Sequence, residues 1–101
     1  MTTKKRYGTK GVEKDYGAVT FAKLLHTYRV TAELTQNELG EKLGGLGRGI
    51  ICDYENGRRI PSPAKAAEIA EALGEIESYW VQVAVQDYLR QYDLNYIVKL
   101  A

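Results

Sequence analysis

The sequence predicts an all-α fold of five helices, followed by a short C-terminal β-strand. Two observations predict this fold class. Between residues 20 and 92, apolar residues recur at the three- and four-residue spacing of amphipathic helices, and helix-starting and helix-ending residues bound each segment. In residues 94–100, apolar side chains recur at every second position instead, which is the pattern of a strand. The 101 residues are enough for one domain.

The first two predicted helices have clear start signals. Thr20 can cap the first helix through its side-chain oxygen. Thr35 and Glu38 stand three residues apart before the second, so each side chain can bond the free backbone N–H of the other. This second helix runs to about Leu43 and ends at Gly44-Gly45. The apolar stripe of the first helix consists of Phe21, Leu24, Leu25 and Tyr28.

The other three predicted helices are also bounded by specific residues. The third spans residues 48–54 and ends at Asn56-Gly57, because Gly tolerates the left-handed conformation beyond a helix. Ser62-Pro63 opens the fourth helix and Gly74 closes it. The fifth begins at Ser78. Its inward-facing residues are expected to be Trp80, Val81, Val85, Tyr88, Leu89 and Tyr92.

The predicted strand, Leu94–Leu100, cannot be stable alone, because the N–H and C=O groups of a strand need a partner. Two partners are open at this point. One is the N-terminal segment, and the other is the same strand of a second copy of the chain.

Composition narrows the class of protein. Hydrophobic residues make up 45% and charged residues 27%, which is typical of a globular domain and not of a disordered chain. No window reaches the roughly 18 apolar residues of a membrane span, and the first twenty residues hold no secretory signal. One Cys gives neither an internal disulfide nor a structural zinc site. We therefore expect a cytoplasmic protein with no cofactor and no metal ion.

The net charge of +1 hides a gradient along the chain. Residues 1–20 carry +3, residues 21–60 carry +1 and residues 61–101 carry −3. Such a dipole can orient a protein on a polyanion. The basic lead-in, residues 1–19, is either a soluble tail or an arm that enters a DNA minor groove.

Two short helices joined by a Gly-rich turn have the sequence shape of a helix-turn-helix. The segments that carry a closer likeness are L-T-Q-x-E-L-G-x-K-L-G at 34–44, Y-E-N-G-R-R-x-P-S at 54–62 and I-A-x-A-L-G at 69–74. In these residues the chain resembles the Cro/CI-type (XRE-family) helix-turn-helix over residues 20–74. The resemblance implies a lambda-repressor-like fold in which residues 20–74 bind DNA and residues 75–101 form a dimer.

The resemblance also implies roles for particular residues. The second helix of such a motif lies in the major groove, and the positions that face base edges are Arg48, Gly49 and Asp53. Arg48 can bond guanine O6 and N7, Gly49 allows close backbone approach, and Asp53 either accepts from cytosine N4 or holds Arg48 in place. The residues implied to bind phosphates are Thr35, Gln36, Asn56, Arg58 and Arg59.

The turn departs from the family pattern by one extra residue. We place Leu46 at the buried turn position and treat one Gly of Gly44-Gly45 as inserted. Gly47 then stands where Ser or Thr would cap the recognition helix, so the cap is weaker. The predicted reading face is also poor in Gln, Ser and Asn, so base discrimination is expected to rest on Arg48 and on DNA shape.

Several other residues have a structural alternative to a functional role. Arg29 matches a family position that pairs with the Glu of E-N-G, here Glu55. Cys52 is expected to be a small packing residue, the alternative being a reactive thiol. His26 is expected on the solvated surface. A catalytic pair of Cys52 and His26 is disfavoured because the family resemblance places both on elements with other uses.

We therefore expect a transcriptional regulator, a repressor, that binds a pseudo-palindromic operator as a homodimer and is not an enzyme. An antitoxin that neutralises a toxin protein and represses its own promoter is the alternative, and an interaction module that has lost DNA binding is a third. The dimer is expected to form through Trp80, Tyr88, Tyr92, Tyr96 and Val98.

Overall fold

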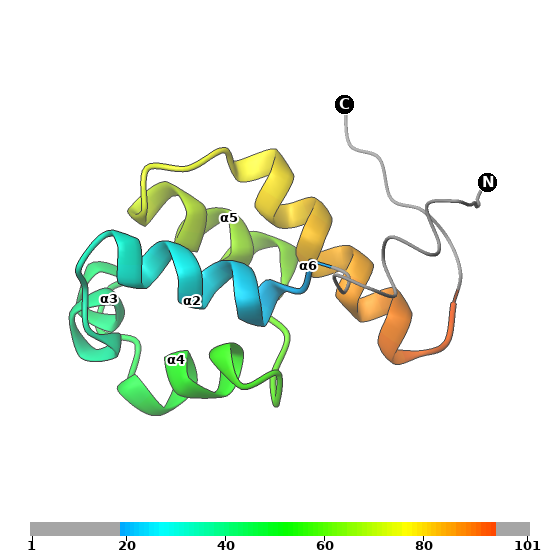
Figure 1. The fold of residues 1–101 in the computed structure, drawn as a ribbon, viewed down its shortest axis with the longest axis horizontal. Coiled ribbons are helices and arrows are strands. Elements are labelled where there is room, and N and C mark those ends of the chain that lie inside the picture. Colours follow the sequence, from blue (N-terminus) through cyan, green and yellow to red (C-terminus); the bar gives the residue numbers. More distant parts are fainter. Residues whose placement is uncertain (1–18, 95–101) are drawn as a thin grey trace.

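The computed structural model describes residues 19–94, which form five α-helices and no strand. The five predicted helices are all present, so the all-α prediction is confirmed; none of those within residues 19–94 is long and apolar enough to cross a membrane. The predicted strand, Tyr96 and Val98 within it, and the basic lead-in lie outside the described residues, apart from one residue of each. The helices are α2 (Phe21–Thr31), α3 (Gln36–Lys42), α4 (Arg48–Glu55), α5 (Pro63–Ala72) and α6 (Glu77–Gln91) (Figure 1).

Side-chain caps begin three of the helices where the sequence predicts them. The hydroxyl oxygen of Thr20 accepts a hydrogen bond from the backbone N–H three residues on, at 3.2 Å, and that of Ser62 does the same at 3.1 Å. Thr35 and Glu38 form the complete capping box, with hydrogen bonds of 3.0 and 2.8 Å. These bonds satisfy N–H groups that have no partner inside a helix.

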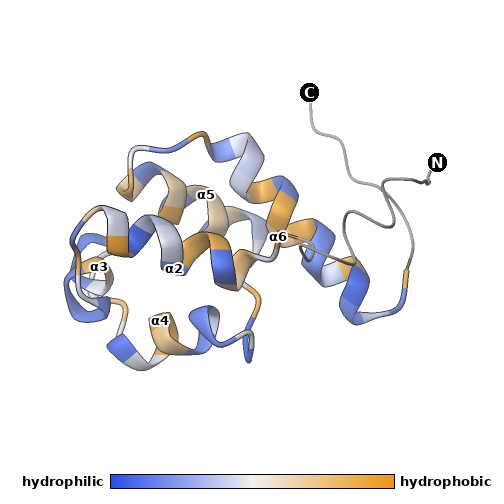
Figure 2. Cartoon of the chain, viewed as in Figure 1, coloured by the Kyte–Doolittle hydropathy of each residue, from blue (hydrophilic) through white to orange (hydrophobic). Residues whose placement is uncertain are grey.

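All five helices contribute to one core around Trp80. The Trp80 side chain is 1% exposed and meets the rings of Phe21 and Tyr28 edge to face, with centroids 5.6 and 5.4 Å apart. Figure 2 shows apolar residues along the sides of α2, α5 and α6 where these helices meet. Because Trp80 belongs to α6, the core crosses residue 74, the boundary that the sequence predicts between a DNA-binding part and a dimerisation part.

Helix α6 corrects three details of the sequence prediction. It begins at Glu77, after an N-cap Ile76 that makes no side-chain bond, and not at Ser78. Trp80 is buried within the chain, so it is not available for an interface between chains. Tyr88 and Tyr92 do not face inward, because they are 51% and 58% exposed. The physical reason is length: α6 has 15 residues and α5 has 10, so the last turns of α6 extend past the other helices (Figure 1).

The turn between α3 and α4 depends on close backbone contact at Gly40. The carbonyl of Gly40 accepts bonds from the N–H groups of Gly45 and Leu46, at 3.1 and 2.9 Å. A Cβ atom on Gly40 would lie 2.0 Å from the carbonyl oxygen of Leu46, so no larger residue fits there. Gly44 and Gly45 both have positive φ, +82° and +92°, which suits Gly. Leu46 is half-buried against the core, at the turn position predicted for it.

At the end of this turn Gly47 is the N-cap of α4 and makes no side-chain bond, as predicted. Helix α4 is therefore held in place by packing and not by a side-chain bond at its N-cap. Ile51, which is fully buried, and Tyr54 supply that packing.

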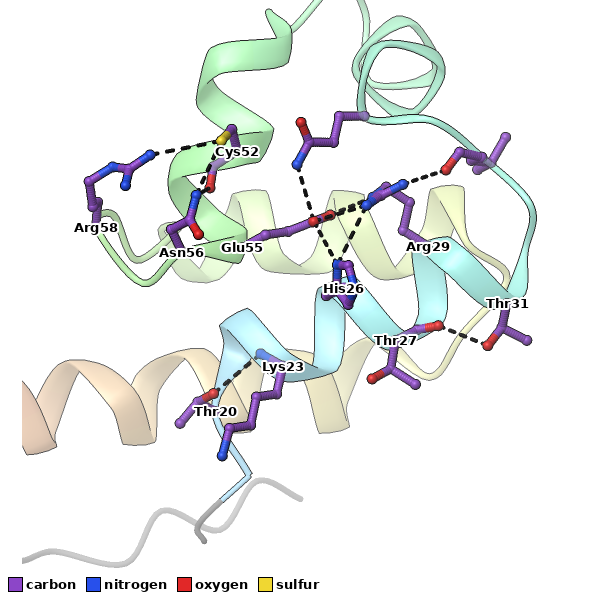
Figure 3. Close-up of polar contacts among 12 residues, drawn as sticks. Thr20, Lys23, His26, Thr27, Arg29, Thr31, Cys52, Glu55, Asn56 and Arg58 are labelled. Atoms are coloured by element: carbon purple, nitrogen blue, oxygen red, sulfur yellow. Dashed lines mark hydrogen bonds and ion pairs between the residues drawn. The ribbon is translucent and has the colours of Figure 1, made fainter.

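A buried carboxylate, Glu55, joins the first three described helices. It lies at the end of α4 with 5% of its side chain exposed, and it accepts bonds from two Arg29 nitrogens of α2 at 2.5 and 3.1 Å. His26 Nδ1 lies 3.0 Å from the same carboxylate, and Gln36 Nε2 of α3 donates to it at 3.2 Å (Figure 3). Arg29 also donates to the carbonyl of Leu34 at 2.6 Å. The predicted pair of Arg29 and Glu55 is confirmed, and His26, although 59% exposed, contributes to it.

The charge state of Glu55 follows from these contacts. Burial alone would raise the pKa of its carboxyl group, but the hydrogen bonds from Arg29, His26 and Gln36 outweigh burial and hold the pKa below its usual value. Because the pKa is lower in the folded state, the ionised carboxylate stabilises the fold at pH values above the pKa of the unfolded chain, about 4.3. That stabilisation is lost as the pH falls through the folded-state pKa.

We expect Gly40→Ala to destabilise the fold by about 3 kcal/mol, because the added methyl group collides with backbone and not with a movable side chain. Gly49→Ala is the matched control: no atom lies within 4 Å of its added Cβ, and the φ angle is ordinary. It should stabilise the fold by about 0.5 kcal/mol. Urea unfolding of both variants measures the difference, and equal effects would contradict this account of the turn.

We expect Glu55→Gln to lower the free energy of unfolding by about 3 kcal/mol at pH 7, because it leaves the guanidinium of Arg29 buried without a counter-charge. The difference from wild type should begin to shrink as the pH falls below the pKa of the unfolded chain, about 4.3, and should continue to shrink through the lower folded-state pKa, because the wild-type carboxylate then becomes protonated. Urea unfolding between pH 3 and 7 checks both points. Glu71→Gln, which removes an exposed carboxylate from α5, should stay within about 0.5 kcal/mol of wild type.

Candidate nucleic-acid interface

One face of α4 is turned away from the core. Ile51 and Tyr54 face the core, whereas Arg48 and Gly49 are exposed and Asp53 is half-buried. At 3.6 residues per turn, positions 48, 49 and 53 lie within about 140° of one another around the helix axis, on the side opposite Ile51 and Tyr54. The structure thus brings together the three residues predicted to read bases.

Arg48 is the first residue of α4, and its side chain is exposed. Its side chain forms no hydrogen bond or ion pair with any residue in the range 19–94. An exposed guanidinium without an internal partner retains all five N–H donors for a ligand. This arrangement suits bidentate recognition of guanine, for which Arg is the commonest residue.

Asp53 is paired, but not with Arg48. Its Oδ1 atom lies 3.0 Å from Nε of Arg58, and its Oδ2 atom lies 3.7 Å from Nε of Arg59. The hydrogen bond from Arg58 to Asp53 also raises the pKa of the Arg58 guanidinium. The alternative in which Asp53 holds Arg48 is therefore wrong for this structure, and the carboxylate instead holds two residues predicted to bind phosphates.

The turn after α4 explains why these residues meet. Gly57 has φ +75°, and the backbone N–H of Arg58 donates to the carbonyl of Asp53 at 3.0 Å while that of Gly57 donates to the carbonyl of Tyr54 at 3.3 Å. This pair of bonds is the Schellman motif, which reverses the chain at a helix end. The Asn56-Gly57 pair predicts the end of the helix, and the same signal could have predicted that residue 58 returns beside residue 53.

Asn56 and Cys52 interact with each other at this end of α4. The amide nitrogen of Asn56 donates to the carbonyl oxygen and to the sulfur of Cys52, at 2.9 and 3.2 Å (Figure 3). Nη2 of Arg58 lies 3.8 Å from the same sulfur. The half-buried thiol is thus in contact with two polar side chains, and the Asn56 amide closes the helix end instead of standing free.

The two remaining residues predicted to bind phosphates lie at the start of α3. Thr35 uses its hydroxyl oxygen in the capping box, and Gln36 donates one amide N–H to Glu55. The second amide N–H of Gln36 and the free backbone N–H groups of the first turn still point to an anion-binding role. Glu55 is the last residue of α4 and precedes Asn56. The hydrogen bond from Gln36 to Glu55 therefore places the Gln36 side chain at the same end of α4 as Asn56.

Sequence reasoning missed one further contact, at the start of α2. The backbone N–H of Phe21 donates to Oδ2 of Asp87 at 2.8 Å, and Arg90 bonds both Asp87 and the carbonyl of Val19. The bonds from Phe21 to Asp87 and from Arg90 to Val19 join residues 66 and 71 positions apart, so no local pattern announces them. Within residues 19–94, no group of three or more His, Cys, Asp or Glu is placed to hold a metal ion.

Comparison with known families agrees with this geometry. The model of the helix-turn-helix family matches residues 25–81, which is more than half of the chain and runs from α2 into α6. The chain matches no curated protein and no solved structure. The matched range contains the packed pair α3 and α4 with its Gly-rich turn, and it confirms the resemblance to Cro/CI-type proteins. The chain therefore belongs to the helix-turn-helix family and is a DNA-binding transcriptional regulator of the XRE type, with α3 and α4 as its motif.

Proposed function

We propose that this protein is a repressor that binds a pseudo-palindromic operator as a homodimer, with α4 in the major groove. The observation that carries the proposal is the guanidinium of Arg48, which lies at the exposed start of α4 and has no partner within residues 19–94. In helix-turn-helix proteins the N-terminal residues of the second helix contact base edges. Gly49 follows without a side chain, so the backbone of α4 can approach the bases closely.

Contacts to phosphates would come from the opposite end of α4 and from the start of α3. Arg58 and Arg59 are 62% and 55% exposed, and they follow the turn that ends α4. Gln36 lies against that end through Glu55. Phosphate contacts fix the register of a protein on DNA, whereas base contacts select the sequence. Residues of the first turn of α4 would thus contact bases, and residues around its last turn would contact phosphates.

The proposed homodimer would use the end of α6. Tyr88 and Tyr92 are exposed there and stack edge to face, with ring centroids 5.3 Å apart. Tyr88 borders a cavity of about 510 Å³ between α6 and the chain before α5. Exposed aromatic side chains beside an apolar hollow are typical of protein interfaces. The cavity is lined by Ile60, Pro61, Ser62, Pro63, Ala84, Val85 and Tyr88.

We expect Arg48→Ala to weaken binding to a matched site by about 1–3 kcal/mol and to relax selectivity at one base pair. Arg58→Ala should weaken binding to all sequences alike and lower the salt slope by about one. Selection of duplexes from a random pool, followed by titrations at several salt concentrations, measures both. Sequence-blind losses from both variants would show that Arg48 does not read a base.

We expect light scattering at micromolar concentration to give the mass of a dimer, and Tyr88→Glu to shift it to that of a monomer, because a carboxylate would be buried in the interface. Tyr79→Glu is the matched control, since Tyr79 is a similarly exposed Tyr, 43%, in the first turn of α6. A monomeric wild-type chain, or equal effects from the two variants, would contradict the proposed interface.

A further inference from the structure

We propose that Asp53 is a specificity-determining residue that acts through Arg58 and Arg59 and not through a base. By pairing with both arginines, its carboxylate lowers the affinity of the phosphate-gripping end of α4 for DNA of unrelated sequence. The inference rests on the proposed function, that is, on DNA binding through the exposed face of α4. Asp53 is thus a positioning residue for the two arginines.

Backbone geometry fixes the first of these pairs. The Schellman turn holds the N–H of Arg58 3.0 Å from the carbonyl of Asp53, so the two side chains start from neighbouring points. From there Nε of Arg58 reaches Oδ1 at 3.0 Å, and Nε of Arg59 lies 3.7 Å from Oδ2. Each carboxylate oxygen therefore faces one arginine. The carboxylate is thus directed at Arg58 and Arg59 and not at Arg48.

The pairing changes the charge that a DNA backbone meets. Asp53, Arg58 and Arg59 together carry +1, whereas the two arginines alone would carry +2. A phosphate that approaches either guanidinium also approaches the carboxylate, and like charges repel. Non-specific affinity for DNA depends on how many phosphates the protein neutralises, so the carboxylate lowers it.

The carboxylate does not remove the arginines from use. Both guanidiniums are more than half exposed. Arg58 forms a hydrogen bond to Asp53 through Nε, and Arg59 faces Asp53 through Nε in a longer ion pair, so most of their terminal N–H groups remain open to a phosphate. On a matched site the phosphates meet guanidiniums that Asp53 already orients, which offsets part of the repulsion. On unrelated DNA no such match exists. Arg48 has no such carboxylate partner within residues 19–94, so the guanidinium that is proposed to contact a base keeps its full positive charge.

Three variants test this inference. Asp53→Asn removes the negative charge and keeps the shape, Asp53→Glu keeps the carboxylate, and Glu71→Gln removes an exposed carboxylate from α5 as a control for net charge. Fluorescence anisotropy would follow each full-length variant on two duplexes at several salt concentrations. One is a duplex that the wild-type chain selects from a random pool, and the other is a scrambled duplex of the same length. Circular dichroism melts check that every variant is folded.

We expect Asp53→Asn to bind the scrambled duplex about two- to fivefold more tightly, the range that corresponds to exposed ion pairs. The salt slope on that duplex should steepen by about one, and the ratio of selected to scrambled affinity should fall. Asp53→Glu should bind both duplexes with nearly wild-type affinity, because it keeps the negative charge. If Asp53 acted only through the shape of its side chain, the longer Glu side chain would change these affinities. Glu71→Gln should change the two duplexes equally and by less than Asp53→Asn does.

Other results would overturn the inference. A loss confined to one base pair of the selected duplex, with scrambled affinity unchanged, would make Asp53 a base reader. Equal effects of Asp53→Asn and Glu71→Gln would reduce its role to net charge. A wild-type chain that binds neither duplex would contradict the proposed function, and with it the premise of this inference; no outcome among the variants can imitate that result.

Discussion

The buried carboxylate of Glu55 is the constraint on which the DNA-binding face depends. An ionised group in this position needs donors, and they come from α2 through Arg29 and His26 and from α3 through Gln36. The three helices can meet the requirement only at one mutual orientation. Because Glu55 is the last residue of α4, the same bonds determine which way the outer face of α4 points. They also bring Gln36 of α3 beside the C-terminal end of α4.

Local signals in the sequence carry much of the fold. Thr35 with Glu38 and Ser62 with Pro63 announce helix starts through bonds that involve only neighbouring residues, so they can be read without the structure. Burial along α6 could not be read in this way. Trp80 and Tyr88 belong to the same apolar stripe, and only the lengths of the helices packed against α6 decide that Trp80 is covered while Tyr88 is not.

The candidate site divides in the same way. The exposed position of Arg48 on α4 follows from helical spacing and from the family pattern. The pairing of Asp53 with Arg58 depends on how the chain reverses after Asn56, which a count of residues along a helix does not reveal. The near-neutral total charge of the chain has a counterpart at the C-terminal end of α4, where Asp53 pairs with Arg58 and Arg59. Positive charge is present at the face that would meet DNA, but part of it is matched inside the protein.

The position of Trp80 has a consequence for the DNA itself. Its ring is shared by α2 and α6, so the end of α6 and the motif that contains α4 are parts of one rigid body. A dimer formed at the end of α6 would hold its two copies of α4 at a fixed distance and orientation relative to each other. An operator with one additional central base pair would turn one half-site by roughly 35° about the DNA axis, and the DNA would have to untwist between the half-sites to make up the difference.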